Sequence, residues 1–238
     1  MWICKMSSSY SKKLTKYFKK LKNVSKMKIF IGLFGLISAK TECNESKYSP
    51  LGCFTDDPPF SVPGYRPARM PQSVSTVNPT FKLTNSRYTD NSIDWQNVAT
   101  NRFVSGQMVT VLTHGWTAEW DDASFLNDGR DAFKRKDRDF RNLIDDVDII
   151  RSYCSGNPWQ NVNYLGLDWS GGSKALDYPL AAANTQVAGR AIAYLFNQLK
   201  RAGWSNSQFH CAGHSLGGHV CSYAAKYAKS EFGLTLNR

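Results

Sequence analysis

The chain has 238 residues, of which 42% are hydrophobic, and a formal net charge of +11 from 30 Lys and Arg against 19 Asp and Glu. This apolar content excludes a disordered polyelectrolyte, and the sequence shows neither the glycine period of a collagen nor the repeated long apolar runs of a membrane bundle. The length fits one globular domain or slightly more. The remaining question is whether the positive charge indicates a protein that binds polyanions.

The charge is concentrated at the N-terminus. Residues 1–40 contain ten lysines, no arginine and no acidic residue, so the rest of the chain has 20 basic and 19 acidic residues and a net charge of +1. A net charge of +1 on the remainder of the chain is too small to attract a polyanion such as a nucleic acid. We therefore expect no nucleic-acid partner.

The basic stretch leads into an apolar run, Ile29–Ile37, followed by the small residues Ser38 and Ala39. This is the layout of a secretory signal, with a long basic n-region, a short apolar h-region and a cleavage site. Nine residues span about 14 Å as a helix, roughly half of a bilayer core, which disfavours a membrane anchor. The absence of arginine disfavours a mitochondrial transit peptide. Residues 1–39 are predicted to be the signal region of a secreted, extracellular protein, while the true start (Met1 or Met27) and the cleavage point stay open.

Five cysteines follow the predicted leader, and an odd number leaves one free, intermolecular or paired outside this chain. They are Cys43, Cys53, Cys154, Cys211 and Cys221. The first two are close enough in sequence to close a small loop, and the other pairings stay open. The sequon Asn44–Ser46 is consistent with a glycosylated, exposed N-terminal segment.

Residues 40–80 form a Pro-rich N-terminal segment that contains seven of the nine prolines. Proline disfavours long helices and central strands, so we expect an irregular segment along the surface. Residues 81–238, which contain only two prolines, are predicted to form the part of the chain with regular structure.

Regular elements are predicted from residue 108 onward. Residues 108–113 form a β-rich apolar run that ends in a turn at His114 and Gly115, and residues 122–147 fit an exposed amphipathic helix. A second buried strand is predicted over 162–169.

Three more elements complete the pattern. Apolar residues from Ala188 to Leu199 recur at helical spacing, a short strand is predicted over 208–213, and a final helix over 216–230. Strands that alternate with helices indicate an α/β protein with a mostly parallel sheet and helices on both faces.

One motif in this pattern points to chemistry. Gly213–Gly217 reads Gly-His-Ser-Leu-Gly and lies between a predicted strand and a predicted helix. A strained strand-to-helix turn lifts the Ser215 hydroxyl clear of the sheet as a candidate nucleophile, and the flanking glycines let the backbones pass closely. The Leu216 N–H at the helix start is a candidate oxyanion donor, and the Trp116 N–H in the turn after the first strand is the second.

These residues resemble the pancreatic lipase family of secreted α/β-hydrolases, which includes triacylglycerol lipases and phospholipases A1. Four segments carry the resemblance in the family's order: Leu51–Phe60, Thr113–Trp116, Leu167–Gly172 and Ala212–Val220. The resemblance implies the α/β-hydrolase fold and a serine carboxylic-ester hydrolase that degrades glycerolipids at a lipid–water interface through an acyl-enzyme. It implies no metal or other cofactor. Triacylglycerol and phospholipid both stay open as substrates, and so does the oligomeric state.

A serine nucleophile needs a base and an orienting acid, which follow it as Asp or Glu and then His in α/β-hydrolases. After Ser215 the chain holds one acid, Glu231, and one histidine, His219, in the wrong order. His214 adjoins the serine, so its side chain should project to another side. We therefore expect an incomplete hydrolase fold: an N-terminal fragment, inactive alone, with the triad acid and base beyond residue 238.

Other readings are weaker or stay open. The order His114, Asp168, Ser215 is that of chymotrypsin-like proteases, but those proteases consist of two β-barrels, whereas this chain alternates strands with helices. We therefore favour structural roles for both His114 and Asp168, with His114 buried and fixing the oxyanion loop. Zinc on the histidines and the cysteine of residues 210–219 matches no usual spacing. A catalytically inactive lipid-binding relative remains the alternative function. Three tryptophans near loop ends either pack or contact acyl chains: Trp116, Trp120 and Trp169.

Overall fold

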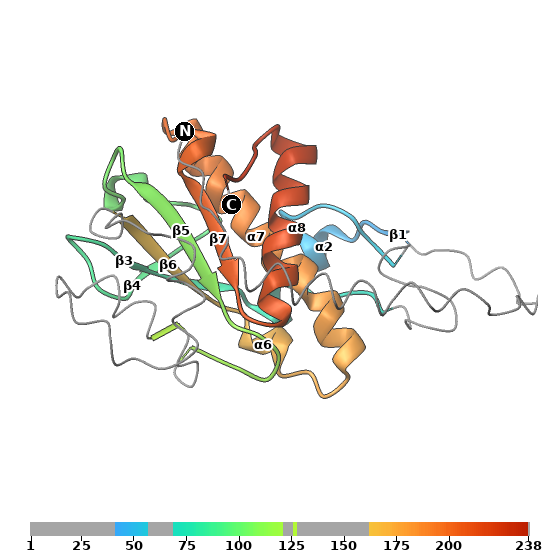
Figure 1. The fold of residues 1–238 in the computed structure, drawn as a ribbon. Coiled ribbons are helices and arrows are strands. Elements are labelled where there is room, and N and C mark those ends of the chain that lie inside the picture. Colours follow the sequence, from blue (N-terminus) through green and yellow to red (C-terminus); the bar gives the residue numbers. More distant parts are fainter. Residues whose placement is uncertain (1–40, 57–68, 121–125, 128–161, 238) are drawn as a thin grey trace, which may run out of the picture.

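The computed structural model describes residues 41–56, 69–120, 126–127 and 162–237 (Figure 1). The predicted leader lies outside these residues, and so does the predicted helix over 122–147 apart from Leu126 and Asn127. The elements are, in chain order, β1 (Thr41–Glu42), α2 (Glu45–Tyr48), β2 (Phe54–Thr55), α3 (Val74–Val77), β3 (Thr80–Thr84), β4 (Asn91–Ile93), η1 (Thr100–Arg102), β5 (Met108–Thr113), β6 (Val162–Asp168), α6 (Ser170–Ser173), α7 (Tyr178–Arg201), η4 (Asn206–Gln208), β7 (Phe209–Gly213) and α8 (Leu216–Phe232).

Five strands form the main sheet in the order β4-β3-β6-β5-β7. The strands predicted at 108–113, 162–169 and 208–213 are confirmed as β5, β6 and β7, and they run parallel to one another. The expectation of a mostly parallel sheet holds only in part for the described strands, because β3 pairs antiparallel with both β4 and β6. A short connection after β3 lets the chain reverse directly, whereas a parallel neighbour would require a long crossover. The sheet is therefore mixed.

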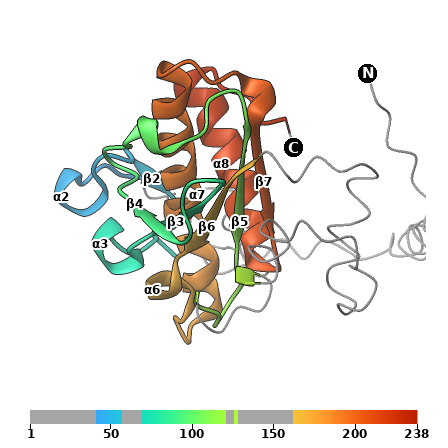
Figure 2. The same cartoon turned by 90° about the vertical axis from the view of Figure 1, so that its left-hand side faces the viewer.

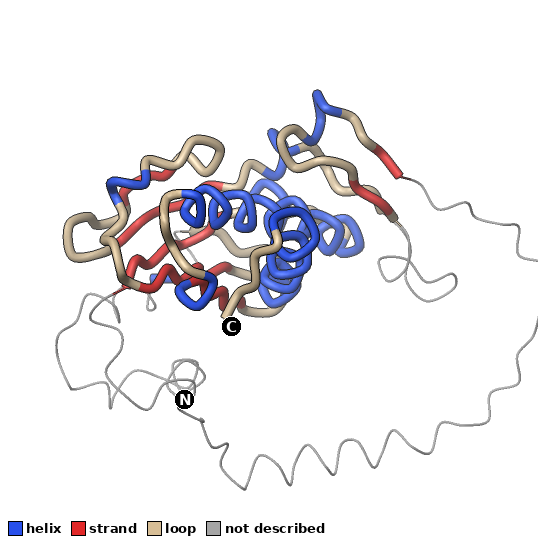
Figure 3. Tube along the Cα trace, turned by 90° about the horizontal axis from the view of Figure 1, so that it is seen from above, coloured by secondary structure: helices blue, strands red, loops and turns tan. Residues whose placement is uncertain are grey.

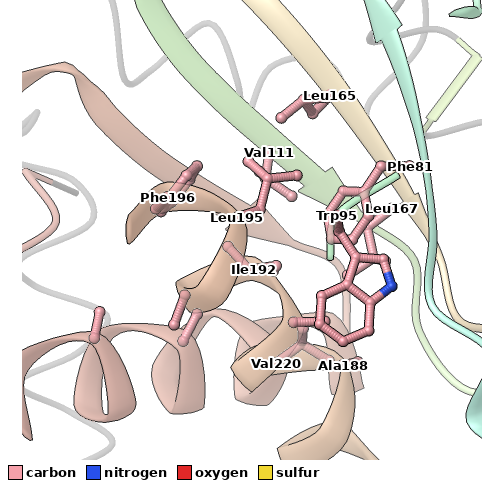
Figure 4. Packing of buried hydrophobic residues seen from close by; sticks show 14 of the residues in the cluster. Phe81, Trp95, Val111, Leu165, Leu167, Ala188, Ile192, Leu195, Phe196 and Val220 are labelled. Carbon is pink, nitrogen blue, oxygen red and sulfur yellow. The ribbon is translucent and has the colours of Figure 1, made fainter. Parts of the chain in front are cut away.

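The two long helices lie next to each other on one face of the sheet (Figures 1 and 2). Their apolar residues pack against alternate strand residues, which places Val111, Leu165 and Leu167 against Ile192 and Leu195 (Figure 4). On the opposite face the described residues form a smaller cluster of Leu112, Trp120, Leu126 and Tyr164. The expected helices on both faces are thus seen on one face only among the described residues.

Both helices extend beyond the predicted limits. α7 begins ten residues before the predicted 188, with Pro179 in its first turn, a position where a missing backbone N–H is tolerated. α8 spans Leu216–Phe232 and ends at Gly233, whose φ of 58° is the left-handed conformation that favours glycine at a helix end. No helix among the described residues has the length and apolar character needed to cross a bilayer.

The N-terminal segment is tied to the two helices by Arg190. In the Pro-rich region the described helices and strands preceding β3 are at most four residues long, and the β1–β2 pair projects away from the five-stranded sheet (Figure 3). The Arg190 guanidinium donates to the carbonyls of Leu51 and Cys53 and stacks between the rings of Phe54 and Tyr227. Burial lowers the pKa of Arg190, although the group stays charged. This contact orders a segment whose sequence alone predicts little structure.

Candidate active site

Ser215 occupies a strained turn at the carboxyl end of β7. Its backbone has φ 53° and ψ −120°, a conformation that residues with a side chain rarely adopt. The serine is exposed, and α8 begins directly after it at Leu216. The turn therefore presents the serine hydroxyl at the edge of the sheet, at the N-terminus of a 17-residue helix.

Glycines allow the turn to sit this close to its neighbours. A methyl group added to Gly213 would lie 2.1 Å from the backbone of Gly217, and one added to Gly217 would lie 2.6 Å from the Thr113 carbonyl oxygen. Likewise, a methyl on Gly115 would lie 2.9 Å from Ser215 Cβ. The loop after β5 and the turn after β7 are thus in backbone contact, as the flanking glycines of the motif predict.

The two candidate oxyanion donors flank this contact. Trp116 follows Gly115, and Leu216 follows Ser215. Neither backbone N–H donates to a carbonyl of the described residues. The adjacent hydrogen bonds that fix the turn run from His214 N to Thr113 O at 3.1 Å and from Gly217 N to His214 O at 2.8 Å. Both N–H groups thus lack a backbone acceptor among the described residues, which a donor reserved for an oxyanion requires.

The loop that carries Trp116 is fastened to α6 and the residues after it. Thr117 N donates to the Ser173 carbonyl at 3.1 Å, and the Ser173 hydroxyl donates to the Ala118 carbonyl at 2.8 Å. The Trp116 indole N–H donates to the Ala175 carbonyl at 3.0 Å. Sequence reasoning missed this support because it joins residues more than fifty positions apart.

His114 and Asp168 form a buried pair beneath the same loop. His114 is 1% exposed; its Nδ1 donates to the Gly115 carbonyl and its Nε2 lies 3.0 Å from Asp168 Oδ1. The Trp169 N–H also lies 3.0 Å from Nε2, so that nitrogen accepts from Trp169 when the ring is neutral and donates to Asp168 when it is protonated. Burial alone would raise the pKa of Asp168, but hydrogen bonds from His114 and Ser170 outweigh it and hold the pKa below its usual value. Both ring nitrogens are thus engaged within the protein, and the pair joins the loop after β5 to the end of β6.

The remaining ionisable residues near the motif do not complete a triad. His219 lies one turn beyond Ser215 on α8 and is exposed, and Glu231 lies 16 residues along the helix, a separation of about 24 Å. The His214 ring lies beside Gly115, since a methyl there would approach its Nδ1 to 3.4 Å. After Ser215, the described residues do not contain an acid followed by a histidine.

Two disulfides form among the described cysteines, Cys43–Cys53 and Cys211–Cys221. The sequence suggested the first as a possible small loop and left the second open, while Cys154 lies outside the described residues. The second brackets the serine motif, and the only sequence signal for it is two cysteines ten residues apart on either side of Ser215. No group of three or more potential metal ligands occurs in the described part of the chain.

The three tryptophans separate by burial. Trp120 and Trp169 are 5% and 0% exposed and therefore pack in the interior, whereas Trp116 is 38% exposed. The Trp116 ring meets the Tyr178 ring edge-on at 5.0 Å, and Leu176 nearby is 96% exposed. An exposed apolar patch, Trp116, Leu176 and Tyr178, thus adjoins the candidate oxyanion loop.

Comparison with known proteins identifies the family. The family model described as Lipase matches residues 44–238. The chain belongs to the pancreatic lipase family. Pancreatic triacylglycerol lipase of Myocastor coypus is 28% identical over 207 residues, which cover 84% of this chain and 39% of that protein. The Homo sapiens enzyme is 27% identical, with 84% and 38% covered. Pancreatic lipase-related protein 2 of Myocastor coypus is 28% identical, with 87% and 40% covered.

The chain thus spans about two fifths of the length of these lipase relatives. Membership of the lipase family implies the α/β-hydrolase fold, to which the mixed sheet with its parallel β6-β5-β7 core corresponds. The two disulfides are typical of proteins from an oxidising, extracellular compartment.

Proposed function

We propose that this chain provides the nucleophile and the oxyanion donors of a secreted serine carboxylic-ester hydrolase that acts on glycerolipids. The observation that carries the proposal is the Ser215 turn: an exposed serine with φ 53°, at the end of a parallel strand, in backbone contact with a second loop. That geometry is strained for a serine and is typical of functional sites.

The roles of the individual groups follow from their places. Ser215 Oγ attacks the ester carbonyl carbon, its proton passes to a general base, and the carbonyl oxygen becomes an oxyanion. The N–H groups of Trp116 and Leu216 stabilise that oxyanion, aided by the positive end of the α8 dipole. The alcohol then leaves, and water releases the fatty acid from the acyl-enzyme. The proposal assigns neither the base nor its acid to a described residue.

The apolar patch beside the loop supports a lipid substrate. Trp116, Leu176 and Tyr178 are the exposed large apolar side chains among the described residues, and they gather on the side of the oxyanion loop. An acyl chain of a glycerolipid has the apolar surface that such a patch would cover.

The test uses the protein expressed from its complete coding sequence, assayed on p-nitrophenyl butyrate, a triacylglycerol emulsion and phosphatidylcholine vesicles. We expect Ser215→Ala to lower turnover by about 10³-fold or more, since the nucleophile has no substitute. Ser222→Ala is the matched control: it removes an exposed hydroxyl from the same helix and should leave turnover within about twofold. Lipid binding without hydrolysis by the wild type, or equal activity of wild type and Ser215→Ala, would overturn the proposal.

A further inference from the structure

The Cys211–Cys221 disulfide closes a covalent ring around Ser215. It joins the third residue of β7 to the sixth residue of α8, with a Cα–Cα distance of 5.5 Å. The strained turn is the connection between these two elements. The disulfide therefore fixes the distance between the strand that enters the turn and the helix that leaves it.

Only one side chain in the second half of β7 faces the helix layer. In the parallel register with β5, Phe209 lies opposite Val109, Cys211 opposite Val111, and Gly213 opposite Thr113. The valines belong to the core that faces the helices, so Phe209, Cys211 and Gly213 face the same way. Phe209 is fully buried, but Gly213 has no side chain. Cys211 is thus the side chain that connects the last three residues of β7 to the helix layer.

The turn itself requires support. The φ of 53° at Ser215 is disfavoured for any residue with a side chain and persists only when the surroundings determine it. Hydrogen bonds from His214 N and Gly218 N contribute, at 3.1 and 3.0 Å. These bonds, together with the one from Gly217 N to the His214 carbonyl at 2.8 Å, hold the turn's own backbone and its contact with β5, whereas the disulfide adds a covalent side-chain link between β7 and α8 themselves.

We propose that the Cys211–Cys221 disulfide is a positioning element for Ser215, and that its reduction by a dithiol reversibly lowers turnover while the domain stays folded. Both cysteines are partly exposed, so a small reductant reaches the bond. In the exchange, the two thiols of the reductant are oxidised to a disulfide, and Cys211 and Cys221 each gain one electron and one proton to become thiols. The turnover part of this inference rests on the proposed function; the positioning part concerns the turn alone.

The chain contains its own matched control. Cys43–Cys53 has the same sequence separation of 10, so its loss gives the unfolded chain the same extra loop freedom. It lies in the N-terminal segment beside the β1–β2 pair, outside the serine turn (Figure 1). If a disulfide affects only global stability, its removal should change kcat and the unfolding temperature in the same way at either position.

The experiment compares wild type, Cys211→Ala/Cys221→Ala and Cys43→Ala/Cys53→Ala, each from the complete coding sequence. The unfolding temperature of each variant is measured first. Well below it, kcat and KM on p-nitrophenyl butyrate are then determined, together with amide hydrogen exchange of the peptide covering residues 212–220. A titration of the wild type with a dithiol, followed by re-oxidation, replaces the first variant if that variant does not fold.

We expect loss of Cys211–Cys221 to lower kcat by about tenfold or more with KM little changed, because a displacement of about 1 Å at a reacting group has effects up to about 10²-fold. Exchange in the turn should accelerate in that variant alone, and the dithiol should lower kcat in wild type and in Cys43→Ala/Cys53→Ala but have no further effect on Cys211→Ala/Cys221→Ala. Equal kcat losses in both double variants, or unchanged exchange in the turn, would overturn the positioning role. An inactive wild type would overturn the proposed function, and hydrogen exchange would then decide the positioning role by itself.

Discussion

Replacing Gly217 by alanine, with Gly218→Ala as its control, tests whether the close approach of α8 to β5 places Ser215. A methyl group at Gly217 would lie 2.6 Å from the Thr113 carbonyl oxygen and 2.8 Å from that of His114. A methyl at Gly218 would lie 3.8 Å from its nearest neighbour, the Gly213 carbonyl oxygen, which is ordinary contact. Both glycines are in the first turn of α8, so alanine adds a similar helix preference of about 0.5–1 kcal/mol at each.

The expected magnitudes follow from these distances. Ordinary contact begins at 3.4 Å, so the Gly217 methyl has to move by about 0.8 Å. The obstructing atoms are backbone carbonyls of the sheet and its loop, which cannot rotate away as a side chain can. Overpacking of this kind costs about 1–3 kcal/mol and exceeds the helix gain. The displaced helix start moves Ser215 relative to Trp116, and misplacement by about 1 Å reduces turnover by up to about 10²-fold.

Urea unfolding and kcat on p-nitrophenyl butyrate, measured on the protein from its complete coding sequence, check both effects. We expect Gly217→Ala to lose about 1–2 kcal/mol of unfolding free energy and at least about tenfold in kcat. Gly218→Ala should be as stable as wild type or slightly more so, with kcat within about twofold. If the two variants behave alike in stability and in kcat, the close approach does not place the serine and the reasoning is refuted.

Three further predictions concern other parts of the site and fold. Ser215→Gly should abolish hydrolysis and yet raise the unfolding free energy by about 1 kcal/mol, because glycine adopts φ 53° without strain; a lower value in urea unfolding would contradict this. Burial raises the pKa of Asp168, but hydrogen bonds outweigh it and lower the pKa in the folded protein. The Asp168 carboxylate therefore contributes to the free energy of unfolding above the unfolded pKa of about 4, and this contribution is lost as the pH falls through the folded pKa. The stability difference between wild type and Asp168→Asn should therefore shrink from about pH 6 to about pH 3, and a constant difference would exclude the charge as its cause. Arg190→Met removes the donors to Leu51 and Cys53 and should lower the unfolding free energy by about 2 kcal/mol, with faster hydrogen exchange over residues 41–56 and an unchanged kcat; protection that stays at the wild-type level would show that Arg190 is dispensable there.

The predictions that succeeded are those that depend on local pattern. The apolar run at 108–113 and the periodic residues over 188–199 predicted β5 and the second half of α7, because apolar runs and helical spacing reflect burial. The order glycine, serine, glycine between a strand and a helix located the strained Ser215 turn. The sequence analysis predicted no strands before residue 108, so it missed β3 and β4 and with them the antiparallel half of the sheet, because a strand's partner and direction depend on residues far away in the chain.

The sequence by itself determined that residues 1–40 hold most of the net charge, that the remaining residues form an α/β domain of near-neutral charge, and that Ser215 lies on a strand-to-helix turn. Tertiary structure alone decided the partners of that turn: Gly115 against Ser215, His114 held by Asp168, and Cys211 joined to Cys221. The physical reason is that strand and helix preferences are set by residues within a few positions of one another, whereas these contacts depend on how separate strands meet at one edge of the sheet.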